Sequence, residues 1–297
     1  MRKDIKAVCF GEILWDVFPD KERIGGAPLN VASRLSSMGI ETEMISKTGK
    51  DEKGQKLINY LKNNKIGTRN ISEDEGFSTG IVQVNLSSSG SATYKIKHPA
   101  AWDKIEISEE MKKLVKEADA FIFGSLVCRD EVSRKTLFQL LPEGNFKVLD
   151  INLRPPHYEE GVLFKLIQQA GFIKFNDDEL FEIAAMLGSK YNSLEQNLDF
   201  ISGKTMASSI CVTKGSHGAV FLNEGKLYYN SGFKMKVKDT VGAGDSFLAS
   251  LIAKLLQGEK PQKALDFACA VGALVAGREG ANPKFSTQEI EQFINPE

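Results

Sequence analysis

The segment Asp239-Thr240-Val241-Gly242-Ala243-Gly244-Asp245-Ser246-Phe247 carries the strongest local signal in this chain. Apolar residues recur at helical spacing from Phe247 to Leu255, which predicts a helix over residues 242–256. The two glycines remove side chains at the start of that helix, where backbone N–H groups have no partner within the helix. A phosphate can therefore approach the main chain closely and meet the positive end of the helix dipole.

Asp245 falls in the first turn of the same predicted helix, beside the proposed phosphate position. An anion-binding turn with an adjacent carboxylate indicates phosphoryl transfer to a hydroxyl group, with the carboxylate taking the hydroxyl proton. A second interpretation stays open, because a Gly-x-Gly before a helix is often only a tight turn. An acid in a first turn is likewise often only a capping group.

Composition limits the classes of protein that the chain can belong to. Its 297 residues suffice for one large α/β domain, and 38 Lys and Arg balance 39 Asp and Glu, so no nucleic-acid partner is expected. The four cysteines are widely spaced without a CxxC pair, which favours buried free thiols and a cytoplasmic location. The longest uncharged apolar run, residues 267–277, is too short to span a bilayer, so no membrane partner is expected.

Short apolar segments alternate with helical patterns along the chain. Such continuous apolar strands joined by helices predict a parallel sheet that is covered on both faces. The predicted strands are residues 7–10, 44–46, 120–123, 147–149, 172–175 and 209–212, with a hairpin at 219–222 and 226–229. The predicted helices are residues 28–38, 52–61, 130–141, 162–169, 178–187, 242–256 and 262–276, and a last one from Ser286 with Glu289 as its capping box.

A second, smaller sheet is predicted from a change of pattern. Residues 80–86 and 92–97 alternate apolar and polar side chains around a turn at 87–91, which is typical of a hairpin with one wet face. Together with residues 13–18 it predicts a small β-sheet that stands off the main domain. A mobile lid over a substrate is one interpretation, and an edge hairpin or a dimer contact is the other.

Two further features near the N-terminus suit a polar ligand. Gly25-Gly26-Ala27-Pro28-Leu29-Asn30 is a second glycine turn that enters a helix, and the Asn30 amide offers donors and an acceptor for sugar hydroxyls. Asp16 lies late in an early strand, where its carboxylate can accept two hydroxyl hydrogen bonds. The alternatives are a plain loop with Asn30 as a helix cap and an exposed strand-end acid.

Polar loops also follow successive predicted strands, at the sheet edge where parallel α/β folds bind ligands. Arg154, in the Asp150-x-Asn152-x-Arg154 loop, suits a phosphate or a salt bridge. Asn176 suits a nucleotide phosphate, and Glu179 suits a hydrated Mg²⁺ ion. The alternative for Glu179 is a purely structural role, because acids at helix starts often only interact favourably with the helix dipole. The loop at 213–218 permits the close approach of a nucleotide.

Residues 25–32 and 239–247 resemble the N-terminal and C-terminal signatures of the ribokinase-like carbohydrate kinases, and their order and separation fit as well. The opening at 11–19 and the 150–154 loop are most similar to bacterial fructokinases. The resemblance implies a single domain over residues 1–297, a three-layer α/β/α sandwich with a mostly parallel sheet. It also implies a small β-sheet lid from about 12–24 and 77–102.

The resemblance implies an ATP-dependent transfer of the γ-phosphoryl group to a primary hydroxyl of a sugar, with ATP and Mg²⁺ as cofactors. It makes Asp245 the general base and the N–H groups of Gly242, Ala243 and Gly244 the anion hole. The implied sugar ligands are Asp16, Gly26, Asn30, Asn152 and Arg154. The implied nucleotide ligands are Asn176, Thr213, Gly215 and Gly218, with Glu179 holding Mg²⁺ through water.

Fructose is the expected sugar, and 2-keto-3-deoxygluconate, ribose and a non-catalytic sugar sensor are the alternatives. A dinucleotide-dependent dehydrogenase is disfavoured, because Gly11-Glu12-Ile13 stands where G-x-G-x-x-G should follow the first strand. Lys284 replaces the small hydroxyl residue with which many relatives complete a potassium site, so we do not expect activation by a monovalent cation. The expected partners are a small-molecule sugar and ATP. A homodimer through the lid is compatible with the exposed hairpin, but no feature of the composition indicates it.

Overall fold

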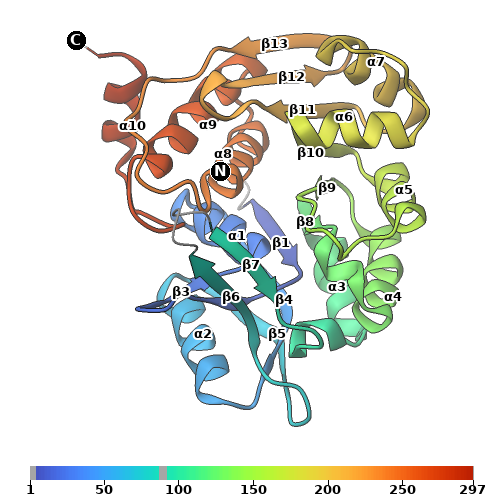
Figure 1. Cartoon of the computed structure of the whole chain (residues 1–297), viewed down its shortest axis with the longest axis vertical. Helices are drawn as coiled ribbons and strands as arrows, with labels where there is room; N and C mark the ends of the chain where they lie inside the picture. Colours follow the sequence, from blue (N-terminus) through green and yellow to red (C-terminus); the bar gives the residue numbers. More distant parts are fainter. Residues whose placement is uncertain (1–4, 87–91, 297) are drawn as a thin grey trace.

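The computed structural model describes residues 5–86 and 92–296. A nine-stranded sheet in the order β13-β12-β11-β10-β9-β8-β1-β4-β5 runs through the molecule (Figure 1). Its pairs are parallel from β5 to β11 and antiparallel from β11 to β13, as the sequence predicts. The strands are β1 (Lys6–Phe10), β4 (Glu41–Gly49), β5 (Ile66–Asp74), β8 (Ala120–Gly124), β9 (Lys147–Asp150), β10 (Phe172–Asn176), β11 (Ser209–Thr213), β12 (Ala219–Asn223) and β13 (Lys226–Asn230).

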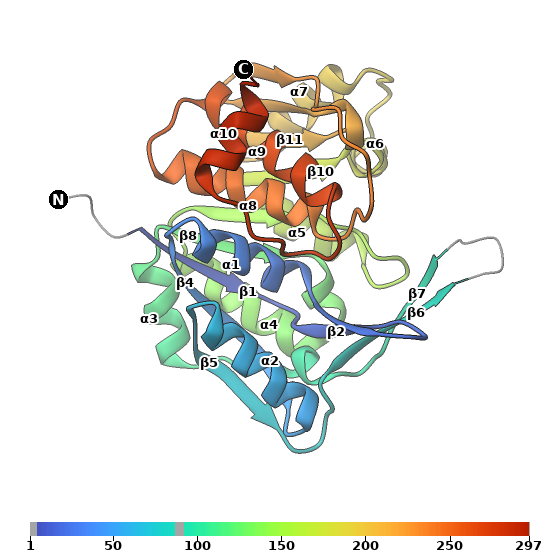
Figure 2. The ribbon, with the colours of Figure 1, turned by 90° about the vertical axis from the view of Figure 1, so that its left-hand side faces the viewer.

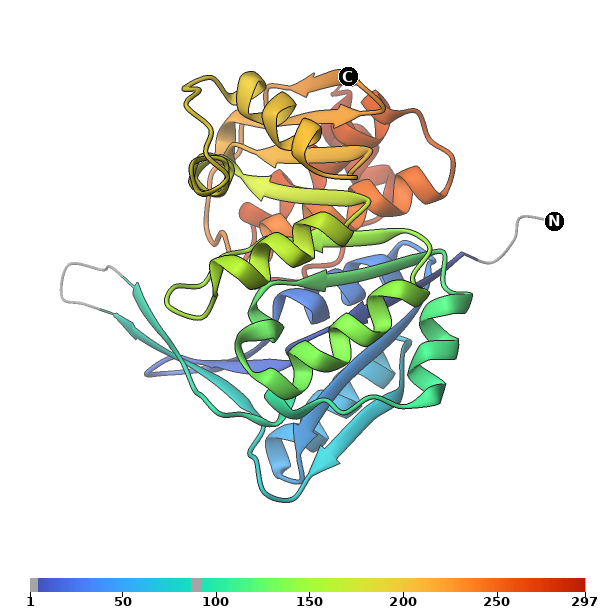
Figure 3. The same cartoon turned by 90° about the vertical axis from the view of Figure 1, so that its right-hand side faces the viewer.

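Helices cover both faces of this sheet and complete the predicted three-layer sandwich. One face carries α1 (Ala27–Ser37), α2 (Glu52–Asn63), α8 (Ala243–Leu256) and α9 (Pro261–Ala276), with α10 (Thr287–Ile294) packed on α9 (Figure 2). The other face carries α3 (Glu109–Glu117), α4 (Glu131–Leu140), α5 (Glu160–Gln169), α6 (Asp177–Met186) and α7 (Leu194–Lys204), green to yellow in Figure 3. Each face has its own apolar core, because the central strands are buried on both sides.

Short 3₁₀ helices fill four of the connections between these elements. They are η1 (Ala101–Lys104), η2 (Leu126–Arg129), η3 (Leu141–Glu143) and η4 (Gly215–His217). Polar side chains mark several helix starts, as for α2, where the Asp51 carboxylate accepts a hydrogen bond from the Gly54 N–H at 2.8 Å. Local sequence thus fixes where the chain turns from loop to helix.

The lid is a separate four-stranded sheet in the order β3-β2-β6-β7 (Figure 2). Its strands are β2 (Leu14–Val17), β3 (Glu22–Gly25), β6 (Gly80–Leu86) and β7 (Ala92–Ile96). Leu14, Val82 and Val84 form a small buried cluster on one side of this sheet. The antiparallel β6–β7 pair confirms the predicted hairpin, while its turn at 87–91 lies outside the described residues.

The last helix corrects one detail of the prediction. The Ser286 hydroxyl accepts a hydrogen bond from the Glu289 N–H at 3.1 Å, as expected of a helix cap. The Glu289 carboxylate, however, pairs with Arg278 and not with the backbone of Ser286. The capping box is therefore only half formed, because a cation competes for the acid.

Two further predictions concern cysteines and membranes. All four cysteines are free and buried, as predicted. Among the helices in residues 5–86 and 92–296, none combines the length and apolar character that crossing a membrane requires.

Candidate active site

The N-terminus of α8 has the backbone geometry of an anion site. Gly242 caps the helix with φ 75°, and a Cβ there would lie 2.5 Å from the Ala281 Cβ, so only glycine fits. In the described part of the chain, the N–H groups of Gly242, Gly244 and Asp245 have no protein acceptor. The Ala243 N–H donates to the Thr240 carbonyl at 3.2 Å. This corrects the expectation that the Ala243 N–H is free, because the turn that starts the helix already uses it.

Asp245 is held by a side chain from the opposite end of the sequence. Its Oδ2 accepts a hydrogen bond from the Asn30 Nδ2 at 2.8 Å. The Asn30 Oδ1 in turn accepts from the Asn282 Nδ2 at 2.8 Å, and Asn30 is only 3% exposed. The cap of α1 is Gly26, not Asn30. In this structure Asn30 therefore orients the carboxylate and is bound at both ends of its amide.

The surroundings of Asp245 tune its proton affinity. Burial raises the pKa of Asp245 to about 6, with a further increase from the negative charge of Asp150. The Asn30 hydrogen bond and the charges of Lys174 and Arg154 act in the opposite direction. A carboxylate with a pKa near 6 is ionised at neutral pH but accepts a proton readily, which suits a general base.

A buried ion pair lies beneath this helix start. The Lys174 ammonium of β10 donates to the Asp150 Oδ1 of β9 at 2.9 Å, and the side chains are 7% and 5% exposed. The other oxygen of Asp150 is buried and has no hydrogen-bond partner among the residues described. Lys174 was not singled out by the sequence analysis, although a cation in the apolar run Phe172-Ile173-Lys174-Phe175 is a readable signal.

Asn176 and Glu179 form a complete capping box at the start of α6. The Asn176 Oδ1 accepts from the Glu179 N–H, and the Glu179 Oε2 accepts from the Asn176 N–H, both at 2.8 Å. The second oxygen of Glu179 accepts from the Leu153 N–H at 2.9 Å. Glu179 therefore fastens the loop after β9 to the start of α6. Burial raises the pKa of Glu179, and the charge of Lys174 opposes that shift.

The donor groups around α8 fit a hydrated Mg²⁺ ion better than a protein-only metal cage. No cluster of three or more His, Cys, Asp or Glu side chains that could hold a metal is found in residues 5–86 and 92–296. The unpartnered oxygen of Asp150 and the carboxylate of Glu179 lie near Lys174, whose ammonium faces the start of α8. Mg²⁺ commonly keeps several waters and uses one or two carboxylates together with phosphate oxygens.

The lid and the loop after β9 supply further polar groups near Asp245. Asp16 lies on β2 against Gly25, whose missing Cβ leaves room for the carboxylate. Burial raises the pKa of Asp16 to about 6, and the charge of Arg154 lowers it. Arg154 is exposed and has no ion-pair partner among the described residues, yet its charge also reaches Asp245. Asn152 has a left-handed backbone with φ 41°, a conformation that Asn tolerates.

Glu12 is a site residue that the sequence analysis missed. It is 3% exposed, and its Oε2 has no hydrogen-bond partner among the described residues. Burial raises the pKa of Glu12 to about 7, and the charges of Arg154 and Asp245 both act on it. Gly26, one of the predicted sugar ligands, packs its Cα against the Glu12 carbonyl. A glutamate two residues after an apolar strand was the available signal.

The predicted nucleotide loop is only partly free for a ligand. The Thr213 hydroxyl donates to the Phe175 carbonyl at 3.3 Å. A Cβ on Gly218, where φ is 76°, would collide with the Asn230 carbonyl, so this glycine serves the packing of the chain against β13. Gly215 faces open space. Of the two glycines, Gly215 is thus the one that leaves room beside the sheet.

The lid is fastened to the loop that precedes α8. The Arg23 Nη1 of β3 pairs with the Asp239 Oδ2 at 2.6 Å, and Arg23 and Lys21 both bind Glu279. The Asp239 carboxylate also accepts from the N–H groups of Val241 and Gly280, each at 3.1 Å. Asp239 therefore has a lid arginine as its cation, whereas Lys284 is exposed.

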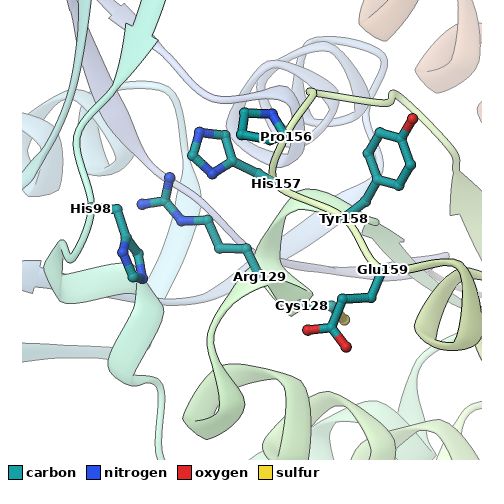
Figure 4. A pocket seen from close by; sticks show the side chains of 7 residues that line it. All are labelled: His98, Cys128, Arg129, Pro156, His157, Tyr158 and Glu159. Atoms are coloured by element: carbon teal, nitrogen blue, oxygen red, sulfur yellow. The ribbon is translucent and has the colours of Figure 1, made fainter.

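A cavity of about 130 Å³ lies beside the loop after β9 (Figure 4). His98, Arg129 and His157 converge on it in the figure. Arg129 is held by the buried Asp103 through two hydrogen bonds of 2.8 Å and stacks on Trp102. Trp102 is fully buried and serves as a packing residue. The complete lining is His98, Cys128, Arg129, Pro156, His157, Tyr158 and Glu159.

A parallel α/β sandwich, a sheet-like lid and an acid beside unpaired helix-start amides define a phosphotransferase that acts on a hydroxyl group. The chain belongs to the pfkB family of carbohydrate kinases, whose profile matches residues 5–288. The protein is therefore a sugar kinase, and the predicted family and ribokinase-like fold are confirmed.

Individual relatives agree with this assignment. Fructokinase-2 of Zea mays is 29% identical over 97% of this chain and 93% of its own length. A solved sugar kinase of Pyrococcus horikoshii in complex with ATP superposes with a TM-score of 0.83 at 25% identity, covering 98% of this chain and all of that chain. A fructokinase of Xylella fastidiosa with bound ATP has a TM-score of 0.86 at 22% identity, with 98% of each chain covered, and supports the fold.

Proposed function

We propose that this sugar kinase is a fructokinase, which transfers the γ-phosphoryl group of ATP to a primary hydroxyl of fructose. The observation that carries the chemistry is the Asp245 carboxylate, held by Asn30 beside the unpaired N–H groups of Gly244 and Asp245. Fructose is supported by relatives named fructokinase that match nearly the whole chain at 28–29% identity.

The proposed reaction needs one proton transfer and one displacement. The Asp245 carboxylate accepts the proton of the sugar hydroxyl while the hydroxyl oxygen attacks the γ-phosphorus. The bond to the β-phosphate oxygen breaks, and ADP leaves with that electron pair. The helix-start amides stabilise the charge on the transferring group. Mg²⁺ would supply positive charge against the phosphates, and Asp150 and Glu179 are the carboxylates that would hold its waters.

The acceptor sugar would lie between the lid and the sheet. Asp16 and Asn152 have no side-chain hydrogen bond to the described residues, so both can bind hydroxyl groups. The Arg154 Nη1 donates to the Leu153 carbonyl at 2.9 Å, and its other N–H groups remain for a ligand. The Asn30 amide already donates one hydrogen bond to Asp245 and accepts one from Asn282. It would bind the sugar with its second N–H and with the remaining lone pair of its oxygen. Asn176, Thr213 and Gly215 are the proposed nucleotide contacts, and Gly218 would shape their loop.

A coupled assay with ATP, Mg²⁺ and a panel of sugars tests the proposal. We expect fructose to give the highest kcat/KM, above 2-keto-3-deoxygluconate and ribose. A different first-ranked sugar would overturn the fructose assignment but leave the kinase chemistry. Sugar binding without turnover of any sugar would instead indicate a non-catalytic sensor.

Two parts of the proposal concern the protein in the cell. Free buried thiols support a cytoplasmic location. The homodimer through the lid stays a prediction, for which the 58% exposed Tyr94 of β7 is the available support. Light scattering of the protein and of the Tyr94→Arg variant tests it, because a dimer through this face should dissociate in the variant.

A further inference from the structure

Lys174 is a buried cation in the middle of the main sheet. It lies on β10, between β9 and β11, and its side chain is 7% exposed. Burying an ammonium group is unfavourable unless it is paired and hydrogen-bonded. Asp150 supplies one partner at 2.9 Å. The ammonium has further N–H groups beyond this bond.

The ammonium faces the first turn of α8. A Cβ added to Gly244 would lie 3.5 Å from the Lys174 Nζ, and that is the nearest atom it would meet. Apart from its chain neighbours and its own helix backbone, only the Lys174 side chain comes within 4 Å of that position. The charge of Lys174 also reaches the carboxylate of Asp245, the next residue along the chain.

The hydrogen-bonding capacity of Lys174 is not used up by the protein. An ammonium has three N–H donors, and the bond to Asp150 is the one that the structure gives it within residues 5–86 and 92–296. Two donors remain, at a point where the N–H groups of Gly244 and Asp245 are also unpaired. Cationic and backbone donors thus converge on one small volume.

We propose that Lys174 binds the phosphoryl group in transit between ATP and the sugar, and that Asp150 holds the ammonium in place for it. This inference rests on the proposed kinase reaction but not on the identity of the sugar. The chain has no G-x-x-x-x-G-K-[ST] motif, in which a lysine at a helix start reaches the outer phosphates. Here a lysine from the neighbouring strand supplies that charge.

The test must separate phosphate binding from a purely structural ion pair. Lys174→Met alone would leave Asp150 buried without a partner, so the main variant is the neutral pair Lys174→Met with Asp150→Asn. It is compared with Asp150→Asn alone, which shares any effect of Asp150 on Mg²⁺. The matched control is Lys47→Met with Asp74→Asn, because Lys47 and Asp74 form another well-buried pair, at 2.8 Å, on the β4–β5 edge. Thermal melting establishes that each variant is folded.

Nucleotide binding by calorimetry, without sugar, is the first readout. We expect the Lys174/Asp150 variant to bind ADP like Asp150→Asn alone, but to bind the non-hydrolysable ATP analogue AMP-PNP about tenfold or more weakly than Asp150→Asn alone does. We expect its kcat to fall by about 10²–10³-fold, in line with the loss of one oxyanion donor, while the KM for sugar stays unchanged. The control should resemble the wild type in each measurement.

An unchanged ratio of AMP-PNP to ADP affinity, with kcat near that of the wild type, would overturn the assignment of Lys174. If the paired variant does not fold, the ratio of AMP-PNP to ADP affinity is measured for Lys174→Gln instead. This substitution removes the charge but keeps an N–H donor for Asp150. A wild-type protein that binds neither nucleotide would overturn the kinase proposal and this inference together. A wild type that binds both nucleotides, beside a variant with an unaltered ratio, would overturn this inference alone.

Discussion

Asp245→Asn removes a negative charge and a proton acceptor while it keeps the shape of the side chain. With a pKa of about 6, Asp245 is about nine-tenths ionised at pH 7. General-base catalysis contributes about 10²–10⁴-fold, so we expect kcat to fall by that factor. In the wild type, kcat/KM should fall tenfold for each pH unit below about 6, and the remaining activity of the variant should lack this acid limb.

The same raised pKa predicts the opposite effect on stability. The folded protein holds the Asp245 proton more tightly than the unfolded chain, whose carboxyl has a pKa near 3.8. The free energy of unfolding therefore falls as the pH rises from about 4 to 6, and it stays lower above pH 6. The shift corresponds to at most about 3 kcal/mol, and partial exposure of the side chain reduces this to about 1–2 kcal/mol. The variant, neutral at every pH, should be more stable by that amount at pH 7 and unchanged near pH 4.

Steady-state kinetics across the pH range and urea unfolding at the two pH values measure both effects. Asp199→Asn, which changes an exposed acid of α7, is the matched control and should alter neither. Turnover near the wild-type value would refute the assignment of Asp245 as the base. A variant that is less stable than the wild type at pH 7 would refute the account of the buried charge.

Four further outcomes follow from contacts in the site. Asn30→Ala removes the hydrogen bond to Asp245, so the acid limb of the pH–rate profile should move above pH 6 and kcat should fall about tenfold; an unmoved limb contradicts this. Arg23→Ala releases the lid from Asp239 and should raise the KM for sugar by about threefold to tenfold, with a weaker salt dependence; steady-state kinetics at low and high salt check this, and an unaltered KM counts against it. Burial raises the pKa of Glu12 to about 7, so Glu12→Gln should stabilise the protein near pH 9 but not near pH 5 in urea unfolding. Activity should be equal in potassium and in a bulky organic cation, since Arg23 already pairs with Asp239; several-fold activation by potassium would show this to be wrong.

The main sheet was predictable because its strands carry their own signal. All five residues of β8 are buried, so its sequence Ala-Phe-Ile-Phe-Gly is continuously apolar. The predicted elements do not include α3, α7 and β5, for the opposite reason. In α3 only Met111 and Val115 are buried, and β5 is largely accessible along the sheet edge, so tertiary contacts and not local pattern decide these elements.

The residues of the candidate site also differ in how far local sequence predicts them. Gly242, Gly244 and Asp245 could be singled out from sequence, because a helix start with free amides is a local property. The bond between Asn30 and Asp245 joins residues 215 positions apart, and Lys174 meets Gly244 only because β10 lies beneath α8. No spacing rule predicts such pairs, since the strand order of the sheet creates them. Lys174, an isolated charge in the apolar strand β10, marks such a pair, and Glu12 is a buried charge in the loop between β1 and β2.

Asp239 connects the two halves of the site. Its carboxylate binds the lid through Arg23, and through the N–H groups of Val241 and Gly280 it also fixes the turn that leads into α8. A shift of the lid therefore changes the charge balance at the residue that shapes the turn before Gly242. The three bonds to Asp239 also keep its pKa below the usual value, although burial acts the other way, so the carboxylate stays charged well below neutral pH. We therefore expect the position of the lid and the shape of the turn before Gly242 to depend on each other through this charge, which would let a kinase exclude water before transfer.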